Sequence, residues 1–425
     1  MIFANGEIHP SNAQNRIFCE LPEQICRTLE TKTLRPDRVI SALDKMGKRI
    51  LSGEFSALVS DPLLSDQVQF AARMLSHEAL ASKLRIELGE NYDAWHTSES
   101  VEGQGTYHRK TAPLGVLLHI AAGNMDALPA WSVIEGLLAG NINLLKLPQA
   151  DHGMTIEFFR LLMEDLPEIR DYVYIFDTPS TDLAGIQRLA EFADGIAIWG
   201  GDAAVSALRK LAPVGCKLIE WGHRLGFCYI SGKAPENELS ALARHILQTR
   251  QLLCSSCQVI YLNTDDFSEV KAFSEHFLQI LEREACGWST ADIGTTAELT
   301  LRRYVRELES IIADETPERL TFQGQRTSVT ACPDNALELS DLNGNVLVKP
   351  LPRHQMMQIL RRSKGYLQTA GLICPAEERV SLTDLLIRCG LNRVLPAGEM
   401  SAAYIGESHD GEYALRRYTR TVNVC

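Results

Sequence analysis

The sequence lacks the features that mark several broad classes of protein. It has 42 Lys and Arg against 54 Asp and Glu, a formal net charge of −12, and no basic run that could bind nucleic acid. No apolar run is long enough to span a bilayer, and the first residues lack the charged and then apolar layout of a signal peptide. We therefore expect a cytoplasmic protein with no nucleic-acid partner and no membrane span.

Common cofactor and metal signatures are also missing. The sequence has no G-x-G-x-x-G, so the usual dinucleotide fingerprint is absent. The eleven cysteines form no regular framework and are odd in number, which favours free thiols in a reducing compartment. Cys254 and Cys257 form a Cys-x-x-Cys, but no second such pair completes the four ligands of a structural zinc site. We predict no metal, with a redox or metal pair at these two cysteines as the alternative.

What the chain does contain is a long alternation of strands and helices. Short buried apolar runs alternate with segments of helical periodicity, which predicts a doubly wound parallel sheet of the α/β class. The strands are expected at 115–120, 143–147, 172–176, 195–199 and 216–221. The pattern restarts near residue 225, with strands at 227–231 and 259–262 on either side of a helix at 237–247.

These patterns divide the chain into three predicted parts. Residues 1–224 would hold amino-terminal helices and a dinucleotide-binding domain, and residues 225–395 a second α/β domain. Residues 396–425 would return to the cofactor or oligomerisation region. The polar, Gly-punctuated stretch 95–111 suits an exposed hairpin that joins the subunits of a homo-oligomer, although a plain surface loop is the alternative.

One cysteine stands in a position suited to chemistry. Cys254 falls in the short connection between the predicted helix at 237–247 and the strand at 259–262, where two rigid elements can hold a thiol exposed. Thiolates are strong nucleophiles, and acyl transfer through Cys divides a hard step into two easier ones. The alternative is a small buried hydrophobe, the commonest state of a cysteine. Cys257 is closer to the strand and is expected to turn into the core.

Other candidate residues follow the predicted strands of the first domain. Ligands of parallel sheets bind at the carboxyl ends of the strands. The residues at these ends are Asn124, Lys146, Gln149, Gly200, Gly201, Asp202, Glu220 and Gly222. Gly200 and Gly201 precede a helix, so backbone N–H groups there could approach a pyrophosphate, although a tight turn explains two glycines equally well. Asn124 can likewise be a turn residue.

The order of these motifs resembles the aldehyde dehydrogenase superfamily. The closer resemblance is to its acyl-CoA reductase branch, the LuxC-like fatty acyl thioester reductases. The motifs are His-Ile-Ala-Ala-Gly-Asn124, Lys146-Leu-Pro-Gln149, Trp-Gly-Gly-Asp202, Glu220-Trp-Gly-His-Arg224, Gln251-Leu-Leu-Cys254 and Cys-Gly-Leu-Asn-Arg393. The likeness runs from about residue 100 to the end of the chain and departs at Cys257, where the family would have Pro.

The resemblance implies an aldehyde-dehydrogenase-like fold and a role for three residues. Cys254 would be the nucleophile that becomes acylated, and the Asn124 side-chain amide with the Cys254 N–H would form the oxyanion hole. Glu220 falls where aldehyde dehydrogenases keep the base that activates water. A reductase does not need that base, so the carboxylate of Glu220 would be structural.

The resemblance also implies a nicotinamide cofactor. Lys146 and Gln149 fall where the adenine ribose is held, and Gly200, Gly201, Asp202 and Gly222 belong to the same cofactor region. A carboxylate at the ribose would repel a 2′-phosphate, whereas neutral Gln149 beside Lys146 tolerates one. We therefore expect NADPH, with NADH as the alternative.

The expected reaction is the reduction of an acyl thioester to an aldehyde through an acyl-cysteine intermediate. The acyl group would arrive as acyl-CoA, on a carrier or on a protein, and an acyl-protein synthetase is an expected partner. Three alternatives stay open: an aldehyde-oxidising dehydrogenase, which Glu220 favours; an acyl-phosphate reductase; and a non-catalytic subunit that keeps the fold for assembly.

Overall fold

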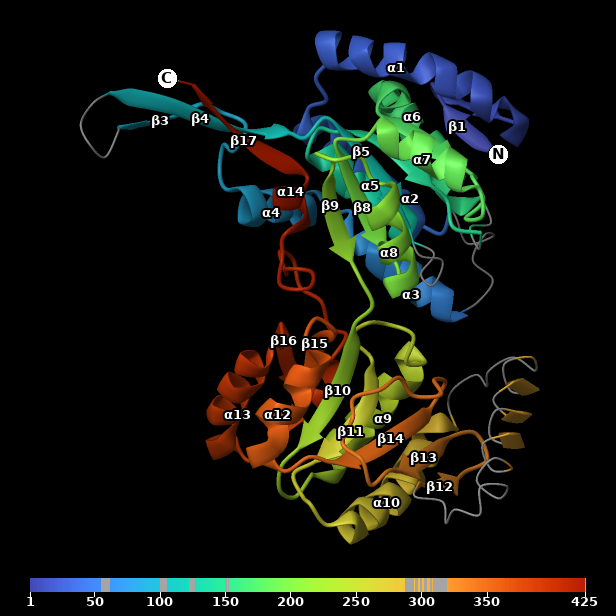
Figure 1. Cartoon of the computed structure of the whole chain (residues 1–425), viewed down its shortest axis with the longest axis vertical. Coiled ribbons are helices and arrows are strands. Elements are labelled where there is room, and N and C mark those ends of the chain that lie inside the picture. The colour runs from blue at the N-terminus through green and yellow to red at the C-terminus, as the bar shows by residue number, and fades with distance from the viewer. Residues whose placement is uncertain are drawn as a thin grey trace. The chain divides into compact units, whose positions relative to one another are not determined.

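The chain is described by a computed structural model. The structure describes residues 1–54, 62–99, 105–121, 127–149, 151, 153–286 and 319–424, with scattered positions between 294 and 308. Its contacts define two compact units, Met1–Gly222 with Tyr404–Cys425, and His223–Ala403. Each unit contains a seven-stranded sheet (Figure 1).

The sheet of the first unit has a parallel core with the strand order β7-β6-β5-β8-β9. These strands are β5 Val116–Ile120, β6 Ile142–Lys146, β7 Val173–Phe176, β8 Gly195–Trp199 and β9 Lys217–Trp221. Because β5 lies in the middle, the chain winds first to one side and then to the other. The doubly wound α/β prediction is confirmed, and the winding reverses between β5 and β8.

Helices connect these strands and pack against the sheet (Figure 1). They are α5 Leu128–Leu138, α6 Met154–Asp165, α7 Leu183–Glu191 and α8 Asp202–Leu211. Pro129 lies in the first turn of α5, where its missing N–H costs no hydrogen bond. The Asp182 side chain caps α7 by accepting from the Gly185 N–H.

The amino-terminal region is mostly helical, as predicted, with α1 Gln14–Thr31, α2 Pro36–Leu51, α3 Pro62–Met74 and α4 His77–Leu88. It also contains a hairpin that the helical periodicity did not predict. Strands β1 Ile2–Ala4 and β2 Glu7–His9 pair with each other, and β1 adds antiparallel to β7. Three residues are too few to show a strand period, but Asn5-Gly6 between them is a strong two-residue turn signal.

A separate three-stranded antiparallel sheet has the order β17-β4-β3. It consists of β3 His96–Glu99, β4 Thr106–Pro113 and β17 Thr419–Val424. The predicted hairpin is therefore present, and the helical turn α14 Ala414–Arg417 precedes β17. The carboxylate of Glu87 accepts from the Leu415 N–H, which fixes the chain just before β17 to α4.

The sheet of the second unit has the order β12-β13-β14-β11-β10-β15-β16, and only β12 Leu320–Gln323 runs antiparallel to its neighbour. The other strands are β10 Leu225–Ile230, β11 Cys257–Leu262, β13 Ser328–Ala331, β14 Asn345–Pro350, β15 Leu367–Ile373 and β16 Arg393–Pro396. The main helices are α9 Glu236–Thr249, α10 Phe267–Ala285, α12 Met356–Leu360 and α13 Ala376–Cys389. Helical periodicity also predicts a helix at 296–314, and most of that range lies outside the described residues.

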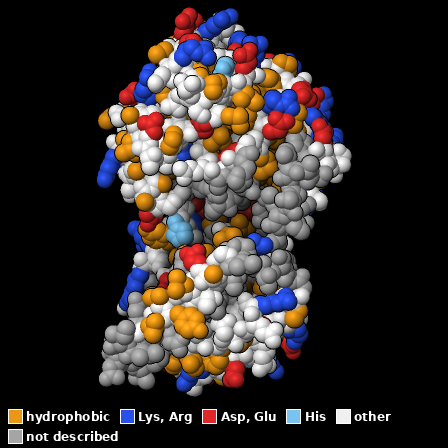
Figure 2. Space-filling model, turned by 90° about the vertical axis from the view of Figure 1, so that its right-hand side faces the viewer, with side chains coloured by type: hydrophobic (Ala, Val, Ile, Leu, Met, Phe, Trp, Pro, Cys, Tyr) orange, Lys and Arg blue, Asp and Glu red, His pale blue; other side chains and the backbone are white. Residues whose placement is uncertain are grey.

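The surface carries charged side chains of both signs, as the composition of the sequence leads one to expect (Figure 2). Acidic and basic side chains are interspersed on the face that Figure 2 shows. Among the residues that the structure describes, no helix is both long enough and apolar enough to cross a membrane.

Candidate active site

The candidate cofactor residues of the first unit follow strands on both sides of the β5–β8 reversal. Lys146 ends β6, Gly200 and Gly201 follow β8, and Glu220 and Gly222 lie at the end of β9. Carboxyl ends of parallel strands meet at one edge of a sheet, and ligands of such sheets generally bind beside a reversal of this kind. Asn124, the predicted oxyanion donor, lies outside the described residues.

Lys146 is a buried cation at this edge. Its side chain is 4% exposed, and Nζ donates to Ser180 Oγ at 2.8 Å. Burial lowers the pKa of the Lys146 ammonium. In the described part of the chain, no carboxylate lies within ion-pairing distance of its Nζ, so the positive charge is available to an anionic ligand. Gln149, three residues later, is exposed and neutral.

Gly200 and Gly201 lead into α8, whose first residue is Asp202. A Cβ added to Gly201 would meet no atom within 4 Å, so this part of the backbone is open to approach. The free N–H groups of a first helical turn favour an anion such as a pyrophosphate. Asp202 occupies the position where an acidic side chain stabilises the helix dipole.

Glu220 is held by an ion pair inside the first unit. Both carboxylate oxygens accept from the Arg209 guanidinium of α8, each at 2.6 Å. A bidentate pair of this kind fixes the carboxylate in one orientation. Because both oxygens are directed at Arg209, the geometry favours a structural role in which Glu220 joins β9 to α8.

In the second unit, Cys254 lies in the connection between α9 and β11, as predicted from the sequence. The Ser256 N–H donates to Leu253 O at 2.9 Å, and the Leu253 N–H donates to Ser256 Oγ at 3.1 Å. These reciprocal bonds close a turn that places Cys254 near its tip. The Cys254 side chain is half-buried. The turn that carries it is held by the two hydrogen bonds.

Two buried glutamine side chains fix this connection. Gln251 donates from its side-chain amide to Cys257 O at 3.0 Å and accepts from the Gly344 N–H at 3.0 Å. Gln258 donates to Gln251 O at 2.7 Å and accepts from Ser340 Oγ at 2.7 Å. Such buried networks rigidify what they hold when their polar groups are satisfied.

The backbone before Cys254 is strained. Arg250 and Gln251 both have left-handed φ values, 47° and 62°. Residues other than Gly in this region cost free energy and persist only where the surroundings hold them. The hydrogen bonds of Gln251 supply that restraint, which explains why a buried amide stands three residues before the thiol.

Gly226 of β10 permits the close approach of the Cys254 connection. A Cβ at this position would lie 2.6 Å from Ser256 O and 3.0 Å from Ser255 O. Any other residue would push the connection away from the sheet. The sequence offered no signal for this contact, because Gly226 is distant from Cys254 along the chain.

A second unpredicted residue touches the thiol itself. Gln368 of β15 donates from Nε2 to the Sγ of Cys254 at 3.2 Å. Its side chain is 3% exposed. The two residues are 114 positions apart, so no motif in the sequence links them.

Cys257 differs sharply from Cys254. It is fully buried as the first residue of β11, as expected, and desolvation raises the pKa of its thiol to about 12. A thiol in such surroundings is inert as a nucleophile. The two cysteines of the Cys-x-x-Cys are thus in different environments. Among the described residues, no group of three or more His, Cys, Asp or Glu side chains is placed to hold a metal ion.

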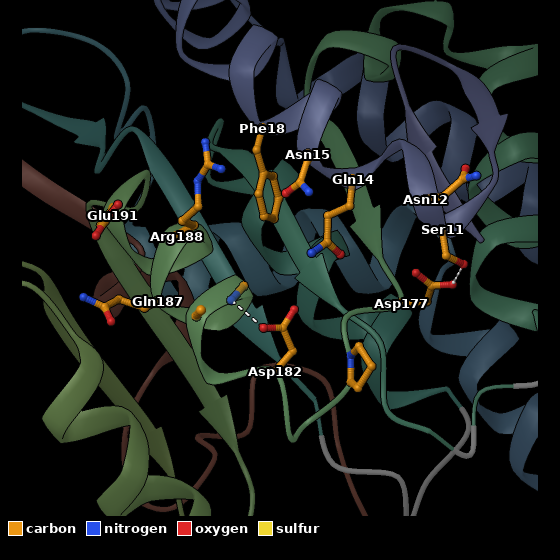
Figure 3. Close-up of a pocket in the computed structure, with 13 residues that line it drawn as sticks. Ser11, Asn12, Gln14, Asn15, Phe18, Asp177, Asp182, Gln187, Arg188 and Glu191 are labelled. Atoms are coloured by element: carbon orange, nitrogen blue, oxygen red, sulfur yellow. Dashed lines mark hydrogen bonds between the residues drawn. The ribbon is translucent and has the colours of Figure 1, made fainter.

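The first unit also has an open hollow of about 870 Å³ between α1 and α7 (Figure 3). Its lining includes none of the candidate residues. Polar groups around it bond to one another: Ser11 donates to Asp177, and Asp182 caps α7. The guanidinium of Arg188 lies over the Phe18 ring at 5.2 Å. These contacts give its lining a packing role.

Solved structures of other proteins share this fold. The structure is similar to a glyceraldehyde-3-phosphate dehydrogenase from Methanocaldococcus jannaschii solved with NADP, with a TM-score of 0.70, 11% identity, and coverage of 98% of this chain and 95% of that one. It is also similar to a bifunctional proline utilization A protein, with a TM-score of 0.74 and 13% identity. That match covers 98% of this chain and 45% of the longer protein. The fold is that of the aldehyde dehydrogenases, as the sequence predicted.

Sequence comparison identifies the family. The profile of the acyl-CoA reductase (LuxC) family matches residues 32–421. A relative is the long-chain acyl-protein thioester reductase of Aliivibrio fischeri. It is 23% identical over an alignment of 442 positions, which covers 97% of this chain and 88% of the relative. The chain belongs to the acyl-CoA reductase (LuxC) family.

Proposed function

We propose that the protein reduces an acyl thioester to an aldehyde, with NADPH as the reductant and Cys254 as the acyl carrier. The observation that carries the proposal is the setting of Cys254: a half-buried thiol near the tip of a fixed turn, with an amide donor at its sulfur. Family membership supports the reaction class, and the name of the relative supports a long-chain acyl group carried on a protein. Acyl-CoA is the other proposed carrier.

The residues of this chain divide the reaction into an acylation and a reduction. The Cys254 thiolate attacks the thioester carbonyl carbon, and the tetrahedral adduct expels the carrier thiolate, which leaves an acyl-cysteine. Asn124 is proposed to donate to the oxyanion, a contact typically worth about 3 kcal/mol. NADPH, when bound, supplies the hydride that reduces the acyl carbonyl. The C–S bond then breaks, which frees the aldehyde and returns the thiolate.

The residues at the cofactor edge fit this reductant. The buried ammonium of Lys146 suits a 2′-phosphate, and neutral Gln149 does not repel one. The open start of α8 suits the pyrophosphate. Gly222 belongs to the same edge.

The test incubates the full chain with NADPH and acyl-CoAs of graded length. A second series uses the same acyl groups, attached to a carrier protein by an acyl-protein synthetase. We expect NADPH consumption matched by aldehyde release. Radiolabelled acyl-CoA without NADPH should label Cys254. Cys254→Ser should lose both label and aldehyde, while Cys257→Ser should keep both. A label on Cys257, or turnover by Cys254→Ser, would contradict the proposal.

A further inference from the structure

The side chain of Gln368 meets the sulfur of the proposed nucleophile from a rigid strand. β15 pairs with β10 at Leu367 and again from Ala370 to Ile373, and the irregularity between these pairs lies at Gln368 and Thr369. The Asn392 N–H also donates to Gln368 O at 3.1 Å. Since this carbonyl is hydrogen-bonded and the residue is 3% exposed, the amide has little freedom to leave Cys254.

A neighbour sets which end of the amide faces the sulfur. Thr369 Oγ1 donates to Gln368 Oε1 at 3.3 Å, which engages the acceptor end. The donor end, Nε2, lies 3.2 Å from Cys254 Sγ. A neutral thiol is a weak acceptor, whereas a thiolate accepts a strong, charge-assisted hydrogen bond. A donor at this place therefore favours the thiolate over the thiol.

We propose that Gln368 is a catalytic residue that stabilises the Cys254 sulfur as a thiolate. This role rests on the proposed function for its use in turnover, where it would act twice. Before acylation, the amide N–H raises the fraction of Cys254 that is ready to attack. In the last step, the C–S bonding pair returns to the sulfur as the hydroxyl proton passes to water, and the same N–H stabilises the departing thiolate.

The experiment measures Cys254 reactivity without substrate or cofactor. Wild type, Gln368→Met and Gln368→Glu are alkylated with iodoacetamide across a range of pH, and each cysteine is followed by peptide mapping. Gln368→Met keeps the length and removes the donor. We expect it to move the midpoint of Cys254 alkylation up by about one pH unit, or roughly tenfold slower labelling at neutral pH. Gln368→Glu should move the midpoint further, because a carboxylate repels the thiolate.

Controls separate this effect from a general disturbance. The exposed Cys19, Cys26 and Cys286 are alkylated in the same samples, and the pH dependence of their alkylation should not change. Ser401→Ala removes a hydroxyl that bonds Ser255 Oγ at 2.8 Å, beside the nucleophile, and should leave the Cys254 midpoint unchanged.

The outcomes are distinguishable from those of the proposed function. If the midpoint shifts as expected but no thioester is reduced, the function is wrong and the Gln368 contact stands. If wild type reduces thioesters but the Gln368→Met midpoint equals that of wild type, the role of Gln368 is overturned. Should Gln368→Met not fold, Gln368→Asn retracts the donor by one methylene, and an unchanged midpoint in that variant overturns the role equally.

Discussion

At the scale of single residues, the environment of a side chain decides its chemistry more than its type. Cys254 and Cys257 are three positions apart, yet one is half-buried beside an amide donor and the other lies in the core with its thiol pKa raised by desolvation. The same holds for Glu220. Its position matches that of a water-activating base, but its carboxylate bonds Arg209 through both oxygens.

Glu220→Gln tests which role this carboxylate has. We expect the variant to slow any aldehyde oxidation or thioester hydrolysis far more than NADPH-driven reduction, because only the first two need a base to activate water. The measurement compares the loss of kcat for aldehyde oxidation and thioester hydrolysis with the loss of kcat for NADPH-driven reduction. Arg209→Gln is the matched control, since it breaks the same ion pair and leaves the carboxylate. Equal losses of kcat in the oxidative or hydrolytic reactions and in the reduction would show that Glu220 also serves the reductive path.

Gln149→Glu tests the choice of cofactor. Wild type should give a higher kcat/KM with NADPH than with NADH. A carboxylate at position 149 should flatten or reverse the preference, because it repels a 2′-phosphate and accepts the hydroxyls of an unphosphorylated ribose. Gln149→Met changes the side chain but keeps it neutral, so it should retain the preference. A wild-type enzyme that prefers NADH would refute this interpretation of Lys146 and Gln149.

At the scale of elements, close contacts between strands and connections hold the site in place. Gly226→Ala would put a methyl group 2.6 Å from Ser256 O, so the connection that carries Cys254 must move. Effective catalysis depends on placement to within about an ångström, where such a shift can cost roughly a hundredfold in rate. We expect a loss of Cys254 acylation of that order in a protein that still unfolds cooperatively. Normal acylation by Gly226→Ala would contradict the contact.

His119 joins β5 to its neighbours and makes the first unit sensitive to acid. The ring is fully buried between Ser132 Oγ at 2.7 Å and Asn143 Oδ1 at 3.0 Å, and desolvation lowers its pKa to about 4. The unfolded chain would bind this proton near pH 6.5, whereas the folded chain binds it only near pH 4. Stability is therefore lost as the pH falls from about 6.5 to 4, by about 1.4 kcal/mol per pH unit.

The corresponding variant is His119→Gln. It should be less stable than wild type at pH 7, because it alters a buried network, but its unfolding free energy should fall less between pH 6.5 and pH 4. Urea unfolding at several pH values measures both effects. Parallel pH profiles for the two proteins would show that His119 does not bind the proton on unfolding.

At the scale of the whole molecule, the three-stranded sheet β17-β4-β3 is the proposed assembly element. We expect a homo-oligomer in which this sheet contacts another subunit. Deleting 414–425 should dissociate it, but that deletion also removes Tyr418, which is fully buried. Truncation after Tyr418 is sharper, because it removes β17 and keeps α14. In sedimentation we expect a smaller species that stays folded.

The control for this truncation is a chain that ends at Val424 and keeps all of β17. It should sediment like wild type. A wild-type monomer would refute the assembly prediction, and so would a truncated chain that keeps the size of the wild-type assembly.

The sequence by itself determined the class of the fold and the placement of Cys254. Buried runs of five or six residues alternate with helical periods, and each pattern reflects hydrogen bonds and burial within a short stretch of chain. The same local patterns predicted α9, β11 and the connection between them. They did not predict β1, whose three residues are too short to show a period, or the strands β12 to β16 of the second sheet.

Only the tertiary structure decided what surrounds the thiol. Gln368 reaches Cys254 because β15 pairs with β10, and Gly226 of β10 makes room for the turn. Strand order brings Gln368 to Cys254 across 114 positions, and it depends on how the whole sheet packs. The ion pair of Glu220 with Arg209 arises in the same way, from α8 packing beside β9. Local patterns place the reactive residue, whereas long-range pairing sets its environment.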